Sequence, residues 1–158
     1  MTDTDSNKVG SLIHVHIAHA DTACAQAFER YVGLSVPRWR VLHFLSEVDS
    51  ATQKEICQRV EMDGWAVTRA VKPLEQAGLI HRTLDPSDNR LTRASITDKG
   101  KEWYKQAQDR RSAFLQQALH GFSDDELALF EQLLLRLTNN FDNPKLANYP
   151  PNVPNLSS

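Results

Sequence analysis

The chain has 158 residues, 41% of them hydrophobic and 24% charged, which is typical of a soluble domain with a real core. Its formal net charge of −2 gives no bulk attraction for nucleic acid, so any DNA-binding surface has to be local. The two cysteines form no metal-binding or disulfide pattern, residues 1–10 lack the apolar core of a signal peptide, and no apolar run could cross a membrane, so we expect a cytoplasmic protein.

Two helices are predicted at the start of the chain. The first covers about residues 9–32, where apolar side chains recur at helical spacing, and it ends at Gly33. Ser35 is the expected N-cap of the second helix, which tolerates Pro37 in its first turn. The apolar positions are Ile13, Ile17, Ala20, Cys24, Ala27, Phe28 and Tyr31 in the first helix, and Val36, Trp39, Val41, Leu42 and Leu45 in the second.

A pair of short helices follows a break at residues 49–51. Thr52 and Glu55 form a capping box for the first, and Asp63 is the expected N-cap of the second, which ends at Gly78. Helical spacing directs Val67, Val71 and Leu74 inward and Trp65, Thr68, Arg69 and Lys72 outward.

The pattern then becomes extended. Residues 79–84 and 94–97 are predicted as two strands joined by a turn at 85–90, with Arg90 at the tip and Arg93 close behind. Two capped helices and a hairpin make a winged helix-turn-helix, in which the second helix fits the major groove and a wing arginine can enter the minor groove. Residues 66–93 carry five basic and three acidic side chains, a local net charge of +2.

Two longer helices are predicted to follow. Thr97 or Asp98 caps one that ends near Gly121, and Ser123 with Glu126 forms a capping box for the last. The last helix has an apolar stripe that is too large for one small winged domain to cover, so we expect a partner chain; the alternative is that it completes a monomer core. The stripe comprises Leu127, Phe130, Leu133, Leu134, Leu137 and Phe141.

From these elements and motifs the chain resembles the MarR family of winged-helix regulators, of the SlyA-like kind, over about residues 10–142. Segment 34–45 (LSVPRWRVLHFL) is similar to the family's second helix, although Arg38 stands where a Gln is usual. Segments 66–69 (AVTR), 74–75 (LE) and 78–82 (GLIHR) match its recognition helix and first wing strand, and 88–90 (DNR) with 96–100 (ITDKG) its wing.

The resemblance implies a mainly α fold with a β-hairpin wing, in one domain over 1–142. In it 34–97 form the winged helix-turn-helix, 9–32 and 98–142 the dimerisation helices, and 143–158 a flexible Pro/Asn-rich tail. It also implies a homodimer on a palindromic operator in double-stranded DNA. The expected DNA-binding residues are Trp65, Thr68, Arg69, Lys72, Asp88, Arg90 and Arg93.

Asp88 and Trp65 each have two interpretations, and the neighbouring Pro73 affects Lys72. Asp88 orients the Arg90 guanidinium through a bidentate pair, or is only a turn former. Trp65 packs on a sugar or a thymine methyl, or shields the helix-turn-helix core. Pro73 lies inside the recognition helix, where it should kink or loosen the helix and disturb the aim of Lys72.

Some residues suggest sensing. His14, His16 and His19 lie on one helix, but packing or surface histidines are favoured over a metal site because no convincing further ligand stands near them in the sequence. Cys24 and Cys57 fall on apolar faces, so inert core cysteines are favoured over an oxidant sensor. Family members bind small aromatic acids in a cleft, which here would be lined by Trp39, Arg38, His43 and His19.

Three classes of function therefore compete. The first is a regulator controlled by a small ligand or other signal, with a redox- or metal-sensing variant as an alternative. The second is a winged-helix module that binds protein. An enzyme is set aside, because the sequence has no phosphate loop, serine elbow or paired carboxylates. No cofactor and no bound metal are expected.

Overall fold

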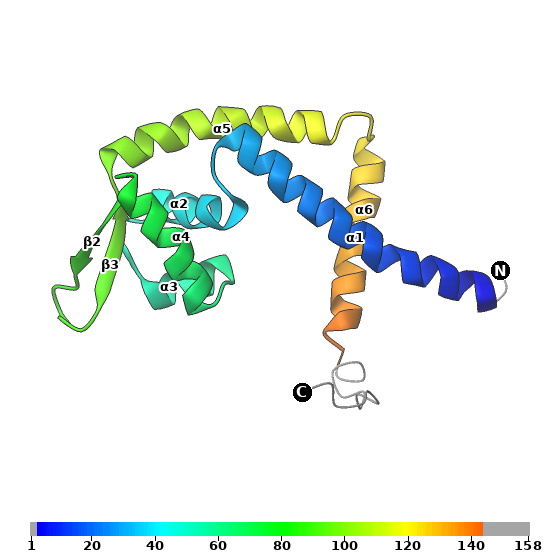
Figure 1. Cartoon of the computed structure of the whole chain (residues 1–158), viewed down its shortest axis with the longest axis horizontal. Coiled ribbons are helices and arrows are strands. Elements are labelled where there is room, and N and C mark those ends of the chain that lie inside the picture. The colour runs from blue at the N-terminus through cyan, green and yellow to red at the C-terminus, as the bar shows by residue number, and fades with distance from the viewer. Residues whose placement is uncertain (1–2, 144–158) are drawn as a thin grey trace, which may run out of the picture. The chain divides into compact units, whose positions relative to one another are not determined.

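The structure, a computed structural model, describes residues 3–143 and divides into two compact units between Ala118 and Leu119 (Figure 1). The described part of the first unit holds α1–α5 and a three-stranded sheet, and that of the second holds α6. This mainly helical fold with a small antiparallel sheet confirms the predicted fold class. The grouping of all helices into one domain stays a prediction, and the predicted flexible tail lies, from residue 144 on, outside the described residues.

The first two helices agree with the sequence pattern, except that α1 begins earlier than expected. α1 spans Asp3–Val32, beginning before the expected residue 9, and α2 spans Val36–Glu47. Ser35 occupies the N-cap position of α2, but its side chain makes no capping hydrogen bond. Pro37 stands in the first turn, where a missing N–H costs nothing.

The helix-turn-helix forms through the predicted caps. The capping box of Thr52 and Glu55 begins α3 (Gln53–Val60), and the Asp63 carboxylate accepts the Ala66 N–H at 2.8 Å at the start of α4 (Gly64–Gln76). α4 runs through Pro73 as one continuous helix, so the proline does not end it.

The wing is a hairpin of β2 (Ile80–Leu84) and β3 (Thr92–Ile96), whose loop lies at the end of the hairpin remote from α5 (Figure 1). A third strand, β1 (Ala51–Thr52), pairs antiparallel with β3, giving the order β1-β3-β2. From the sequence, Ala51 was expected in a break and Thr52 as a helix cap, so this strand was not predicted. Two residues are too few to show an alternating pattern, and the strand exists because β3 supplies its partner.

The base of the wing joins α5 (Asp98–Ala118) through a close contact. The Thr97 hydroxyl donates to the Gly78 carbonyl at 2.7 Å and accepts the Gly100 N–H at 2.9 Å, so of the two predicted caps, Thr97 and Asp98, it is Thr97 that caps α5. A Cβ on Gly100 would overlap the carbonyl oxygen of Leu79, so only glycine allows this approach. The first turn of α5 is thereby fixed against the start of β2.

Two apolar clusters hold the first unit together. One joins the inner faces of α2, α3 and α4 to the sheet, and the other joins α1 and α2 to α5. The largest fully buried side chains of the first cluster are Val41, Leu42, Leu45, Ile56, Val67, Leu74 and Ile80; the second cluster consists of Phe28, Val32, Trp39, Ala107 and Phe114.

The second unit contains one described helix, α6 (Asp124–Phe141), which begins at the predicted capping box of Ser123 and Glu126. None of its side chains is buried. Its exposed large apolar residues are Leu129, Phe130, Leu133, Leu134, Leu135 and Phe141. Among the described residues, no helix has the length and apolar character needed to cross a membrane.

Candidate nucleic-acid interface

α4 has an inner and an outer face, as its periodicity predicts. Val67, Val71 and Leu74 are buried against the core, each less than 7% exposed. On the opposite face four side chains are exposed, which together offer a hydroxyl, two cationic groups and an aromatic ring. They are Trp65, Thr68, Arg69 and Lys72.

Trp65 and Arg69 form a stacked pair at the front of this face. The indole of Trp65 is 68% exposed, and the Arg69 guanidinium carbon lies 4.4 Å from its ring centroid. A ring so exposed does not shield the helix-turn-helix core. The pair presents an apolar surface beside a charged donor, which suits contact with a nucleotide.

Gln53 is a residue of this face that the sequence analysis missed. Its side-chain amide donates to the Gly64 carbonyl at 2.9 Å and to the Thr68 hydroxyl at 3.0 Å, while that hydroxyl donates to Gly64 at 2.7 Å. Gln53 is the first residue of α3, so these bonds set the N-terminus of α4 against α3. In the sequence, only the position of Gln53 directly after the Thr52 cap could have indicated this role.

The wing loop presents Arg90 at the surface. The Asp88 carboxylate accepts the backbone N–H of Arg90 at 2.9 Å, and the Asp88 carbonyl accepts the Leu91 N–H at 2.9 Å. No ion pair joins Asp88 to the Arg90 guanidinium within residues 3–143, so the expected bidentate pair is corrected to the turn-forming alternative. The guanidinium of Arg90 therefore has no ion pair with any part of the chain that the structure describes.

Arg93 has a different environment from the one expected of a DNA contact. Its side chain is 25% exposed and its guanidinium is held by two carboxylates, at 3.1 Å by Asp85 and at 3.5 Å by Glu55. It also donates from Nε to the Ser50 hydroxyl at 2.7 Å and from Nη2 to the Ser50 carbonyl at 3.0 Å. The Arg93 guanidinium is therefore engaged in intramolecular hydrogen bonds and ion pairs.

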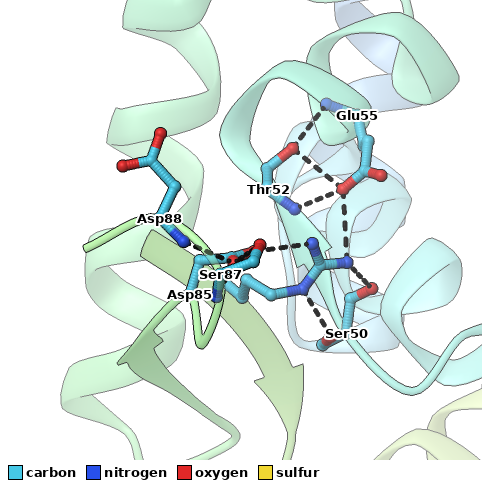
Figure 2. Close-up of polar contacts among 7 residues, drawn as sticks. Ser50, Thr52, Glu55, Asp85, Ser87 and Asp88 are labelled. Carbon is cyan, nitrogen blue, oxygen red and sulfur yellow. Dashed lines mark hydrogen bonds and ion pairs between the residues drawn. The ribbon is translucent and has the colours of Figure 1, made fainter. Parts of the chain in front are cut away.

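Figure 2 shows the acceptors of this network converging from the wing loop and from the start of α3. Asp85, buried at 6% exposure, accepts the Ser87 hydroxyl and N–H and the Asp88 N–H. The two bonds from Ser87, followed by the one from Arg93, hold the pKa of Asp85 well below its usual range. The Thr52 bonds and, to a lesser degree, Arg93 lower the pKa of Glu55.

The cations of residues 66–93 thus fall into two groups. Arg82 is paired with Glu75 at 2.6 Å, and Arg93 with Asp85. The other three, Arg69, Lys72 and Arg90, have no ion pair among the described residues, and all lie on the outer face of α4 or on the wing loop. Within the described residues, the unpaired positive charge of segment 66–93 therefore lies on the outer face of α4 and on the wing loop.

The suggested sensing residues have no assembled site. His14, His16 and His19 are exposed, and residues 3–143 contain no group of three side chains placed to hold a metal. Cys24 is exposed, which corrects the expectation of a core cysteine, because the described α1 side chains are buried only at Phe28 and Val32. Cys57 is half-buried.

Of the residues proposed for a ligand cleft, Trp39 and His43 lie together, with ring centroids 6.3 Å apart. Trp39 is buried and stacks on Tyr104, with ring centroids 5.1 Å apart, and His43 is 2.7 Å from the Tyr104 hydroxyl. Arg38 instead lines a cavity of about 220 Å³ between the starts of α2 and α4. The remaining lining residues are Ser35, Pro37, Trp65, Ala66, Arg69 and Ala70.

Comparisons with known proteins agree with this geometry. A family model described as the MarR family matches residues 32–91. The uncharacterized HTH-type transcriptional regulator YdgJ of Bacillus subtilis is 34% identical over 116 residues, which cover 73% of this chain and 71% of that protein.

Two solved structures share the fold. The organohalide-sensing regulator RdhR, solved with 2,4-dichlorophenol bound, has a TM-score of 0.78 at 20% identity, covering 89% of this chain and 85% of its own. A MarR variant from E. coli in complex with operator DNA has a TM-score of 0.69 at 22% identity, covering 82% and 93% respectively.

Proposed function

The chain belongs to the MarR family of DNA-binding transcriptional regulators, and on this premise we propose that it is a homodimer that binds a palindromic operator and thereby blocks or remodels a promoter. We also propose a cytoplasmic location, because a protein that binds operator DNA must share its compartment. Its relatives are transcriptional regulators and not enzymes.

The observation that carries the proposal is the distribution of free cations. Arg69 and Lys72 are exposed on the outer face of α4, and Arg90 is exposed on the wing loop. In the proposed complex α4 enters the major groove and Arg90 the minor groove. Thr68 and Trp65 complete the reading face with a hydroxyl and an apolar ring. Asp88 acts indirectly, by fixing the backbone of Arg90.

A second copy of the chain is the proposed cover for the exposed apolar helices. α6 has six large apolar side chains exposed and none buried. The described part of α1 adds Leu12, Ile13, Val15 and Ile17, all at least 38% exposed. So many exposed large apolar side chains on one helix such as α6 are unusual for a stable monomer, and a two-fold axis between copies matches a palindromic site.

We propose a small aromatic acid as the effector. Its support is the cavity between α2 and α4, which is lined by Arg38, Arg69 and Trp65 and beside which the Arg69 guanidinium stacks on the Trp65 ring. An aryl carboxylate would pair with the cations and stack on the indole. Because Arg69 and Trp65 also belong to the reading face, such a ligand would compete with DNA.

The salt dependence of binding to DNA tests the function. Neutralising phosphates releases counterions, so affinity for an operator fragment should fall steeply as salt rises, with a linear plot of log K against log salt. A protein-binding winged-helix module would give weak DNA binding with a flat response, and that result would refute the proposal.

A further inference from the structure

The Arg93 guanidinium bridges two parts of the winged unit that are remote in sequence. Arg93 lies on β3. Its guanidinium donates to Ser50 and Glu55, which flank the start of α3, and to Asp85, which directly follows β2. Pairing of Thr52 with Arg93 across the β1–β3 ladder holds the two segments in register. Arg93 therefore fastens the wing loop to the helix-turn-helix.

These contacts leave Arg93 little capacity to bind DNA. A guanidinium has five N–H donors, and the chain occupies four of them. Rotating the side chain toward a phosphate would strip its cation from Asp85, a buried carboxylate, and leaving a buried charge unpaired is costly.

The network continues to the residue that the wing presents. Asp85, held by Arg93, accepts the N–H groups of Ser87 and Asp88 and so orders the loop. Asp88 in turn accepts the Arg90 N–H. The path from Arg93 to the backbone of Arg90 is thus a continuous series of hydrogen bonds.

We propose that Arg93 is a positioning residue that orders the wing loop before DNA arrives, so that Arg90 enters the minor groove without a further loss of loop entropy. This inference rests on the proposed DNA-binding function. It replaces the direct DNA contact expected for Arg93 from the sequence.

Hydrogen exchange on the free protein tests the first half of the inference. Arg93→Gln should speed exchange of the amides of residues 87–91 about tenfold, as expected when a local opening becomes easier. Ser50→Ala, which removes one acceptor and disturbs folding little, should speed the same amides by a smaller factor. Arg82→Gln is the matched control, since Arg82 pairs with Glu75 outside the network, and should leave these amides unchanged.

A double-mutant cycle with Arg90→Ala tests the second half. Arg93→Gln alone should weaken operator binding about tenfold, but in the Arg90→Ala background it should change neither the affinity by more than about twofold nor the salt slope. If Arg93 contacts a phosphate, the double variant will bind more weakly than Arg90→Ala and lose about one further unit of salt slope. That result, or unchanged exchange in Arg93→Gln and Ser50→Ala, overturns the inference.

The two measurements also separate this inference from the function on which it rests. If the parent protein binds no operator DNA, the proposed function fails, while the exchange experiment still reports on the coupling through Arg93. If the parent binds DNA and the cycle is additive, the function stands and the positioning role fails.

Discussion

The guanidinium of Arg69 lies over the indole of Trp65, one helical turn earlier on α4, at 4.4 Å from the ring centroid. The i,i+4 spacing makes the two side chains neighbours on the outer face of α4. The stack restricts the guanidinium to one side of the helix and leaves the ring exposed beside it. The pair thus enters the proposed major-groove contact as a preformed unit.

Trp65→Ala should weaken operator binding by about 1 kcal/mol, because it removes both the stack that orients Arg69 and an apolar contact with DNA. Trp65→Phe keeps an aromatic ring and should lose less than half of the binding free energy that Trp65→Ala loses. Fluorescence anisotropy with a labelled operator measures both. Equal affinity of the alanine variant and the parent would show that Trp65 takes no part in binding.

Arg90→Ala should weaken operator binding by about 1–3 kcal/mol and leave the dimer intact, because only a wing contact is lost. Lys105→Ala, which removes an exposed cation on α5, is the matched control and should bind like the parent. Anisotropy and light scattering report affinity and mass. The wing assignment is wrong if Arg90→Ala binds as tightly as the control.

The stability of the winged unit should fall at acid pH. The pKa of Asp85 is lowered in the folded state, so its stabilising contribution is fully present above its unfolded pKa of about 4 and is lost as pH falls through the folded pKa. Asp85→Asn should therefore lower the free energy of unfolding at pH 7 and reduce its loss below about pH 4.

Urea unfolding between pH 7 and pH 2.5 measures this difference. Asp109→Asn, which changes an exposed carboxylate on α5, serves as the control and should follow the parent curve. Parallel curves for Asp85→Asn and the parent would mean that the Asp85 network does not contribute to the acid sensitivity.

Removal of the chain after Ser123 should abolish the dimer and with it tight operator binding, because it deletes the apolar face of α6. Leu133→Glu is a milder test, since it places one charge among exposed apolar side chains without deleting the helix. Sedimentation equilibrium should give monomers for both. Either a persistent dimer or a monomer that binds the operator tightly contradicts the two-fold model.

Benzoate should weaken operator binding by the parent protein, and Arg38→Gln should remove this response while DNA binding without benzoate persists. The reason is that Arg38 lines the cavity, whereas the free cations of the reading face are untouched. Arg40→Gln is the control, because Arg40 pairs with Glu61 and does not line the cavity. If Arg38→Gln and the parent respond alike, or if benzoate has no effect, the cavity is not the effector site.

Much of the fold was predictable because its signals are local. The capping boxes at Thr52 and Ser123, the cap at Asp63 and the stop at Gly78 each depend on residues within one turn, and all lie as predicted. The outer face of α4 followed from helical periodicity alone. β1 was missed because it owes its existence to β3, some forty residues later.

The environment of Arg93 was not predictable for the same reason. Its partners Ser50 and Glu55 become neighbours only through the β1–β3 ladder, so its charge alone indicated a DNA contact. The exposure of Cys24 was missed because an apolar stripe on a helix indicates burial, but it does not show whether the same chain or a second chain buries it. The Trp65–Arg69 stack could have been expected from its i,i+4 spacing.

The most direct test of the central claim is selection of bound fragments from genomic DNA by the purified protein. A two-fold symmetric consensus should emerge, with half-site centres separated by about 10 base pairs or a multiple, because two copies of α4 must enter successive major grooves on one side of the duplex. Recovery of no enriched sequence, or of a consensus without two-fold symmetry, would contradict a dimeric operator-binding regulator.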